Sequence, residues 1–322
     1  MHFIARVSLC ICCAVPAQPA GAQPYPMRLV RIVVGSPAGS IADVLARPVA
    51  QRLSESLGQQ VLVDNRPGAT GIIANELVAR ALPDGYTLLV SPISFLVVNP
   101  HLNPRLPYDP FRDFAPITQI SVFHHVLAVH PSVPARSVKE LIALARSKPG
   151  AMNFASSGVG SGFHLAGEMF KNMARVDIVH VPFKGTPSVV IDLLAGRVDM
   201  TFIGLLLVQG HIKAGKLRAL AVTGLKRDPL LPGVPTVDES GLRGFDIAGG
   251  HAVFAPAGTS HDIVERLNTA VVRILGTPEM RELWASQGME VVTGTPGQLA
   301  VRMRDDHAKY GRLIKAAGIK ME

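Results

Sequence analysis

Apolar runs typical of buried strands alternate along this chain with longer stretches whose apolar residues recur at helical spacing. The first strand is expected at residues 29–34 and the first helix at 41–57, where Pro48 predicts a kink or a changed start. Further strands are expected at 60–63, 87–91, 126–129, 178–181, 199–203 and 217–222, and further helices at 72–81, 138–147, 163–173, 188–195, from about 260 to 275, from 277, and at 298–316. This alternation predicts an α/β protein with parallel strands and right-handed crossovers.

Two extended stretches, at 122–129 and 246–253, are expected to connect two α/β halves. One domain is then discontinuous, formed by 23–125 plus 251–322, and the second domain is 126–250. A ligand cleft between two such domains would lie at the carboxyl ends of their strands. The segment between residues 100 and 116 is expected to be irregular because of its prolines, at 100, 104, 107, 110 and 116.

The first 22 residues have the features of a secretory signal peptide. A weakly positive start at Arg6 is followed by an apolar stretch too short to span a bilayer and by the small residues Ala20-Gly21-Ala22. All three cysteines lie in this segment, so the mature chain is expected to have no disulfide and no thiolate nucleophile. No later stretch is long and apolar enough to cross a membrane. The mature protein is therefore expected to be a soluble periplasmic chain.

The formal charge of +8 comes from lysines and arginines scattered along the chain. No basic run occurs and aromatic residues make up only 5%, so a platform for stacking nucleic-acid bases is absent and no nucleic-acid partner is expected. A basic surface instead suits an acidic small ligand. His124 and His125 would point to opposite faces of a strand, and no His/Asp/Glu cluster has metal-ligand spacing. Neither a metal nor another cofactor is expected.

Three junctions of the type strand, small-residue loop, helix occur in this sequence. They lie at residues 33–47, 152–163 and 179–187, and each contains glycine. The first N–H groups of a helix have no partner within the helix, and the helix dipole is positive there, so such junctions favour anions. With three anion-binding loops and no evident nucleophile, the sequence indicates a receptor for a carboxylate.

An ordered set of motifs covers nearly the whole mature chain, and the set is far more specific than any one of them. It comprises Pro37-Ala38-Gly39 with 43–47, Asp64-Asn65-Arg66-Pro67-Gly68-Ala69, 81–89, 106–110, 164–168, 179–185, 211–223, 234–236 and 255–259. In this order the motifs resemble the extracytoplasmic receptors of tripartite tricarboxylate transporters, the Bug family. The resemblance implies a type II-like periplasmic binding fold of two domains that closes on a small carboxylate. It also implies a monomer that delivers its ligand to membrane transporter subunits or to a sensor protein.

The resemblance further implies that four loops surround the ligand, those at 36–40, 91–94, 157–161 and 184–186. The candidate substrate-binding residues are Ser36, Ala38, Gly39, Ser40, Asp43, Ser91, Ser94, Ser157, Gly158, Gly160, Ser161, His164, Lys184, Gly185, Thr186 and Ile203. Three of them have a simpler alternative. Asp43 also suits the positive start of a helix, His164 also suits packing, and Lys184 also suits an exposed loop edge.

Several positions differ from the pattern that family members commonly have. Ser36 and Gly250 stand where aromatic residues are frequent, and Ile93 and Ile203 stand where polar residues are frequent. We therefore expect a wider and more apolar pocket, which favours a larger or more apolar acid over short polar dicarboxylates. Ile203 cannot accept a hydrogen bond from an ammonium group, so amino acids should bind poorly.

Two other functions remain open at this point. An exported hydrolase acting on a carboxylate ester or amide would need an activated nucleophile beside a base, and the serine-rich loop at 156–162 has no evident partner. A receptor that reports its ligand to a signalling system would have the same binding site as a transport receptor. Turnover against a panel of esters would distinguish the enzyme from the receptor.

Overall fold

The computed structural model describes residues 25–319, and the expected signal peptide at residues 1–22 lies outside the described residues. The strands are β1 (Val30–Val34), β2 (Val61–Asn65), β3 (Thr87–Pro92), β4 (Phe114–Val129), β5 (Asn153–Ser156), β6 (Val179–Pro182), β7 (Met200–Gly204), β8 (Arg218–Val222) and β9 (Ala248–Pro256). The helices are α1 (Ile41–Leu57), α2 (Ile72–Ala79), α3 (Ile93–Leu102), α4 (Val138–Ser147), α5 (Gly162–Ala174), α6 (Thr186–Leu194), α7 (Gln209–Lys213), α8 (His261–Leu275), α9 (Pro278–Ala285) and α10 (Pro296–Ala317). The expected α/β class is confirmed.

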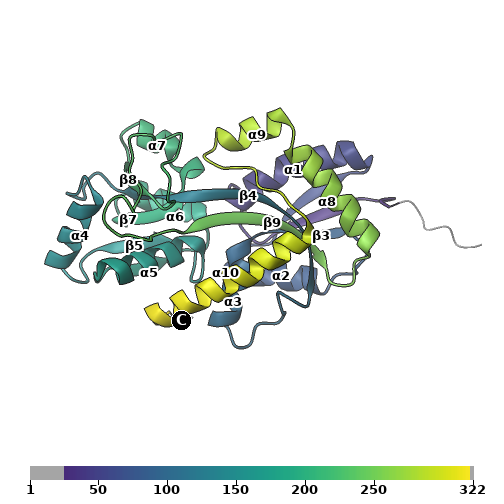
Figure 1. Ribbon diagram of the computed structural model, residues 1–322, viewed down its shortest axis with the longest axis horizontal. Coiled ribbons are helices and arrows are strands. Elements are labelled where there is room, and N and C mark those ends of the chain that lie inside the picture. Colours follow the sequence, from purple (N-terminus) through teal and green to yellow (C-terminus); the bar gives the residue numbers. More distant parts are fainter. Residues whose placement is uncertain (1–24, 320–322) are drawn as a thin grey trace, which may run out of the picture.

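One curled sheet connects two lobes. Its order is β2-β1-β3-β9-β4-β7-β5-β6, with β8 paired to β4. The outer strands of each lobe are parallel, whereas β4 and β9 are antiparallel to their neighbours. These two long strands run side by side through the middle of the molecule (Figure 1). We call the part around β1, β2 and β3 the first lobe, and the part around β5, β6, β7 and β8 the second lobe.

Strand β4 changes partners along its length. It pairs with β9 from Phe114 to His124, and with β7 from His125 to Val129. Strand β4 therefore passes from the first lobe to the second close to residue 125. Strand β9 passes back to the first lobe near residue 250. The domain boundaries expected from the sequence agree with this change of partners and stay a prediction.

The hydrophobic core consists of two layers, one on each face of the sheet. In β1, Val33 belongs to one layer, and its neighbours Ile32 and Val34 belong to the other, since successive strand residues point to opposite faces. One layer is covered by α2, α3, α4, α5 and α10, and the other by α1, α6, α8 and α9 (Figure 1). Each layer includes residues from both lobes.

Two expectations about irregular structure are wrong. The proline-containing stretch does not begin at residue 100, because helix α3 extends to Leu102 with Pro100 inside it. The strand expected at residues 126–129 begins instead at Phe114 and continues past Pro116 by means of a register shift. Helix α1 has the expected bounds, with Pro48 inside it.

Among residues 25–319, no helix combines the length and the apolar character needed to cross a membrane. Within the same residues, no group of three or more His, Cys, Asp or Glu side chains is placed to hold a metal ion.

Candidate anion-binding cleft

A cavity of about 570 Å³ lies between the two lobes. The first lobe lines it with the loops at residues 35–42, 67–71 and 92–95, and the second lobe with the loops at 157–163 and 183–186. Between them, β4 contributes Phe123 and His125, and β9 contributes Gly249, Gly250 and His251. The cavity is therefore placed at the lobe junction, where the sequence predicted a cleft.

Five helices of the described chain begin at this cavity. The residues that precede their first turns all line it, namely Ser40, Gly71, Pro92, Ser161 and Gly185. N–H groups in a first helical turn have no acceptor within their own helix, and each helix N-terminus carries a partial positive charge. The convergence of five such termini gives the cavity a geometry that favours an anion.

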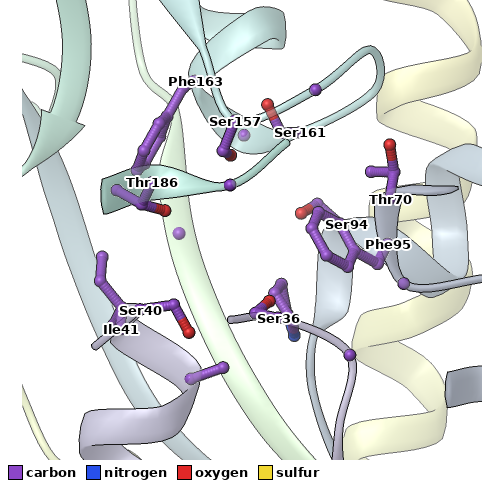
Figure 2. Close-up of a pocket in the computed structure, with 18 of the residues that line it drawn as sticks. Ser36, Ser40, Ile41, Thr70, Ser94, Phe95, Ser157, Ser161, Phe163 and Thr186 are labelled. Atoms are coloured by element: carbon purple, nitrogen blue, oxygen red, sulfur yellow. The ribbon is translucent and has the colours of Figure 1, made fainter. Parts of the chain in front are cut away.

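Hydroxyl groups supplement these backbone donors. Figure 2 shows side chains from both lobes around the same space, and those that carry a hydroxyl are Ser36, Ser40, Thr70, Ser94, Ser157, Ser161 and Thr186. Among the described lining residues, Lys184 is the only lysine or arginine, and it is exposed. Hence the charge of a bound anion would be balanced mainly by helix termini and hydroxyls.

The wall formed by β4 and β9 is aromatic. His125 meets Phe123 and Phe163 edge to face, at centroid distances of 5.4 and 5.2 Å, and His251 stacks on Phe123 at 5.7 Å. Burial lowers the pKa of His125 and that of His251 to about 3, so both rings are neutral at pH 7. This wall offers flat apolar surface and uncharged hydrogen-bonding groups.

The two lobes are in contact over the cavity. Thr70 Oγ1 of the first lobe donates a hydrogen bond to the Val159 carbonyl oxygen of the second, at 3.1 Å. A Cβ atom added at Gly185 would lie 2.7 Å from Cγ of Pro37, and one added at Gly158 would lie 3.0 Å from Thr70 Oγ1. Both glycines have positive φ angles. Glycine at these positions therefore permits the close approach of the lobes.

The expected site residues divide into two groups. Those that line the cavity are Ser36, Ser40, Ser94, Ser157, Gly158, Ser161, Lys184, Gly185 and Thr186. Those that do not line it are Ala38, Gly39, Asp43, Ser91, Gly160, His164 and Ile203. Most residues of the second group stabilise the loops through hydrogen bonds and do not contact the cavity.

Asp43 supports the first loop. Its carboxylate accepts a hydrogen bond from the Gly39 N–H at 2.9 Å and pairs with Arg47 at 2.8 Å. Burial alone would raise the pKa of Asp43, but the hydrogen bonds from Arg47 and Gly39 outweigh it and hold the pKa below its usual value. The Gly39 N–H is thus occupied within the protein, and of the two roles considered for Asp43, the contacts favour the structural one.

Replacing Asp43 by alanine should loosen this loop. We expect a loss of about 1–2 kcal/mol of unfolding free energy, because the Gly39 N–H loses its acceptor and Arg47 loses its partner. Ligand affinity should fall about fivefold as the loop becomes less ordered. Thermal melts and titration calorimetry measure both effects. Glu55→Ala, which breaks an exposed pair with Arg52 on the same helix, is the control and should change neither.

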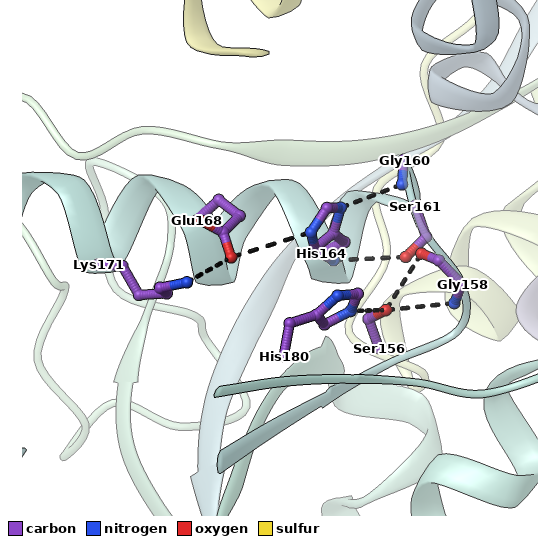
Figure 3. Close-up of polar contacts among 8 residues, drawn as sticks. All are labelled: Ser156, Gly158, Gly160, Ser161, His164, Glu168, Lys171 and His180. Carbon is purple, nitrogen blue, oxygen red and sulfur yellow. Dashed lines mark hydrogen bonds and ion pairs between the residues drawn. The ribbon is translucent and has the colours of Figure 1, made fainter. Parts of the chain in front are cut away.

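His164 has the same supporting role in the second lobe (Figure 3). Its Nδ1 accepts a hydrogen bond from the Gly160 N–H at 3.1 Å, and its ring stacks on His180 at 4.0 Å. Burial lowers the pKa of His164 to about 3 and that of His180 to about 4. Because the Gly160 N–H already has an acceptor, the expectation that the second loop offers it to the ligand does not fit this structure.

Ile203 and Ser91 lie in central strands behind the cavity. Ile203 is fully buried, and it packs in the core opposite Val126 of β4. Ile203 therefore does not contact the pocket, and its position does not support the expectation that it makes the pocket more apolar. The Ser91 hydroxyl is also buried, and it donates to the Pro92 carbonyl oxygen at 3.3 Å.

Two serine–histidine pairs occur next to the site, Ser121 with His251 at 3.3 Å and Ser156 with His180. Ser156 Oγ lies 2.7 Å from His180 Nε2, a distance compatible with general-base activation. Ser156 is fully buried, however, and it does not line the cavity. Its hydroxyl accepts a hydrogen bond from the Gly158 N–H at 3.2 Å and so shapes the loop.

Sequence reasoning missed the aromatic wall. His125 was considered only as a metal ligand, and Phe123, Phe163 and His251 were not considered. Thr70 and Phe95 were missed as well, although Thr70 directly follows a motif that the sequence did indicate. The alternation of β4 places Phe123 and His125 on one face, but it does not indicate that this face meets the cavity.

Comparison with known proteins agrees with this geometry. Residues 45–319 match the model of the tripartite tricarboxylate transporter family receptor. Protein BugT of Bordetella pertussis is 35% identical over 322 residues, which cover 100% of this chain and 99% of that protein.

Two solved structures from Rhodopseudomonas palustris are also similar. Rpa4515 with adipate is 37% identical with a TM-score of 0.89, and the match covers 92% of this chain and 99% of that one. MatC with bound malate is 30% identical with a TM-score of 0.85, covering 90% and 100%. These proteins share a two-domain, type II-like fold of solute-binding receptors, which supports the expected receptor over the alternative of a hydrolase. This chain belongs to the tripartite tricarboxylate transporter family of receptors, the Bug family.

Proposed function

We propose that the protein is a periplasmic receptor that captures one small organic carboxylate in the cleft and delivers it to a tripartite tricarboxylate-type transporter. The observation that carries this proposal is the convergence of five helix N-termini and seven hydroxyls on one cavity. Backbone donors and hydroxyls suit a carboxylate, which accepts several hydrogen bonds at once. Similar proteins have been solved with adipate and with malate.

Binding is proposed to stabilise a closed arrangement of two domains, 23–125 plus 251–322 and 126–250. Loops from both lobes line the cavity, so a ligand that contacts both favours the state in which they meet. The Thr70–Val159 hydrogen bond forms only across the two lobes and adds to that preference. Strands β4 and β9, which connect the lobes, would absorb the motion as a hinge.

The cavity favours an acid with substantial apolar surface. Phenylalanines line it from both lobes and from β4, at 95, 123, 163 and 183, whereas β9 presents Gly249 and Gly250 without side chains. Burial of apolar ligand surface against such a lining is worth about 25 cal/mol per Å². Ligands such as adipate or a benzoate should therefore bind more tightly than succinate or glutamate.

Titration calorimetry and thermal shift with glutamate, succinate, adipate and benzoate test the proposal. We expect 1:1 binding of adipate, benzoate or both, with an increase in unfolding free energy of about 2.7 kcal/mol at a ligand concentration 100 times the Kd. Small-angle scattering should show a more compact protein with ligand, and esters of these acids should not be turned over. Absence of binding by any acid, or tight binding of glutamate alone, would contradict the proposal.

A further inference from the structure

Two consecutive residues of the cleft have a backbone conformation that side chains disfavour. Ala69 and Thr70 have φ angles of +46° and +49°, and they are two of the three non-glycine residues with a positive φ in the part of the chain that the structure describes. Both of them line the cavity. A left-handed conformation costs free energy at any residue with a Cβ atom, so the surrounding structure must hold this segment in place. Strain of this kind at a ligand cavity indicates a functional constraint.

The side-chain amide of Asn99, in α3, holds the segment. Its Nδ2 donates to the Thr70 carbonyl oxygen at 3.2 Å and to the Tyr108 hydroxyl at 3.3 Å. An amide nitrogen carries two hydrogens, so one Nδ2 serves both acceptors. Asn75 Nδ2, from α2, donates to the same Tyr108 hydroxyl at 2.9 Å. Asn75, Asn99 and Tyr108 are at most 5% exposed, so these hydrogen bonds are shielded from competition by water.

The segment that Asn99 holds meets the second lobe directly. Thr70 Oγ1 donates to the Val159 carbonyl oxygen at 3.1 Å. The next residue of that loop also approaches α3, because a Cβ atom added at Gly160 would lie 2.8 Å from Cδ1 of Leu102. The second-lobe loop therefore contacts both Thr70 and the helix that carries Asn99. Since Asn99 fixes the main chain of Thr70, it also fixes the direction in which the Thr70 hydroxyl points.

We propose that Asn99 is a positioning residue for closure of the cleft. Anchored by Tyr108, it keeps the strained segment in its left-handed conformation, so that the Thr70 hydroxyl reaches the Val159 carbonyl oxygen and slows the release of bound ligand. This inference rests on the proposed function, and it gives a role to the motif at 106–110, which does not line the cavity. A contact made only in the closed state affects the release rate more than the association rate.

Stopped-flow kinetics with adipate and benzoate test the inference, since they separate the rates of association and release. Thr70→Ala should raise the release rate about fivefold, because one hydrogen bond between the lobes is lost. Thr70→Ser keeps the hydroxyl and should change the rate by less than about twofold. Asn99→Leu, which leaves Thr70 in place but removes the amide, should raise the release rate about fivefold as well. The association rate should change by less than about twofold in all three variants.

A double variant distinguishes positioning from a general loss of stability. If Asn99 acts through the Thr70 hydroxyl, adding Asn99→Leu to Thr70→Ala should not raise the release rate further, a ratio of about one. Asn268→Leu is the matched control, because Asn268 Nδ2 also makes two hydrogen bonds, to carbonyl oxygens at 2.9 and 2.8 Å, but does not line the cavity. The control should lower the melting temperature, as Asn99→Leu does, and leave the release rate unchanged.

Tyr108→Phe is a second variant in case Asn99→Leu does not fold. It removes only the hydroxyl and keeps the edge-to-face packing of the ring on Phe114 at 5.6 Å, and it should raise the release rate about twofold. If the folded variant releases ligand at the wild-type rate, or if the effects of Asn99→Leu and Thr70→Ala multiply in the double variant, the inference is wrong while the carboxylate receptor stands. If neither acid binds to the folded wild-type protein, the proposed function fails and this inference fails with it.

Discussion

Between pH 7.5 and pH 4.5 the protein is expected to lose several kcal/mol of unfolding free energy. The cause is a set of buried neutral histidines: His125, His164 and His251 with a pKa of about 3, and His180 with a pKa of about 4. In the unfolded chain their pKa returns to about 6.5. The unfolded state therefore binds more protons below pH 6.5, and stability falls as the pH is lowered.

The size of the effect follows from the same linkage. Each histidine contributes up to about 1.4 kcal/mol per pH unit between its unfolded and folded pKa values. The total unfolding free energy of a domain is about 5–15 kcal/mol, so the contribution of four such histidines is a large fraction of it. Urea titrations at half-unit steps of pH measure the slope of unfolding free energy against pH. His251→Asn should reduce it, whereas His261→Asn, at an exposed position, should not. A stability independent of pH from 7.5 to 5 would contradict this expectation.

Replacing Gly158 by valine should weaken ligand binding about thirtyfold. Gly158 has a φ of +127°, and an added Cβ would already lie 3.0 Å from Thr70 Oγ1 across the cleft. The further methyl groups of valine must displace Thr70 or separate the lobes. Overpacking of this kind costs about 1–3 kcal/mol, and about 2 kcal/mol corresponds to thirtyfold in affinity.

The control for this variant is Gly241→Val. Gly241 also has a positive φ, +110°, but an added Cβ there would meet nothing within 4 Å. Both variants carry the backbone strain of a left-handed residue, about 1–2 kcal/mol, and both should lose similar stability. Only Gly158→Val should lose binding, measured by calorimetry with the acid that binds the wild type best. Equal affinities in the two variants would show that closure at this loop does not matter.

Most of the fold could be predicted because its signals are local. Helices α1 and α4 have the expected bounds, and each follows a serine whose hydroxyl accepts a hydrogen bond from the first turn. Helix α3 could not be predicted in this way. Its residues are apolar on nearly all sides and so lack a helical period, and Pro100 suggests a break. Pro100 removes one hydrogen bond of this helix, the one to the carbonyl oxygen of Leu96, and the helix ends two residues after it.

The site could be predicted only where it is built from loops. Ser36, Ser161 and Thr186 belong to junctions that the chain itself specifies by glycines and helix starts. Residues of central strands are different. Alternation separates His124 from His125 and places Ile203 on one face of β7, but it cannot tell which face meets the cavity. That depends on how β4, β7 and β9 lie against each other, which is a property of the whole sheet.

The two hydrophobic layers have a consequence for how this molecule can be divided. Val33 and Phe202 belong to one layer, and Ile32 and Ile203 to the other, although they come from different lobes. Each layer continues across β4 and β9 from one lobe to the other. The two lobes are therefore expected to unfold together, although they can move relative to each other about these strands. A fragment cut at residue 125 or 250 would expose apolar residues of both layers to water.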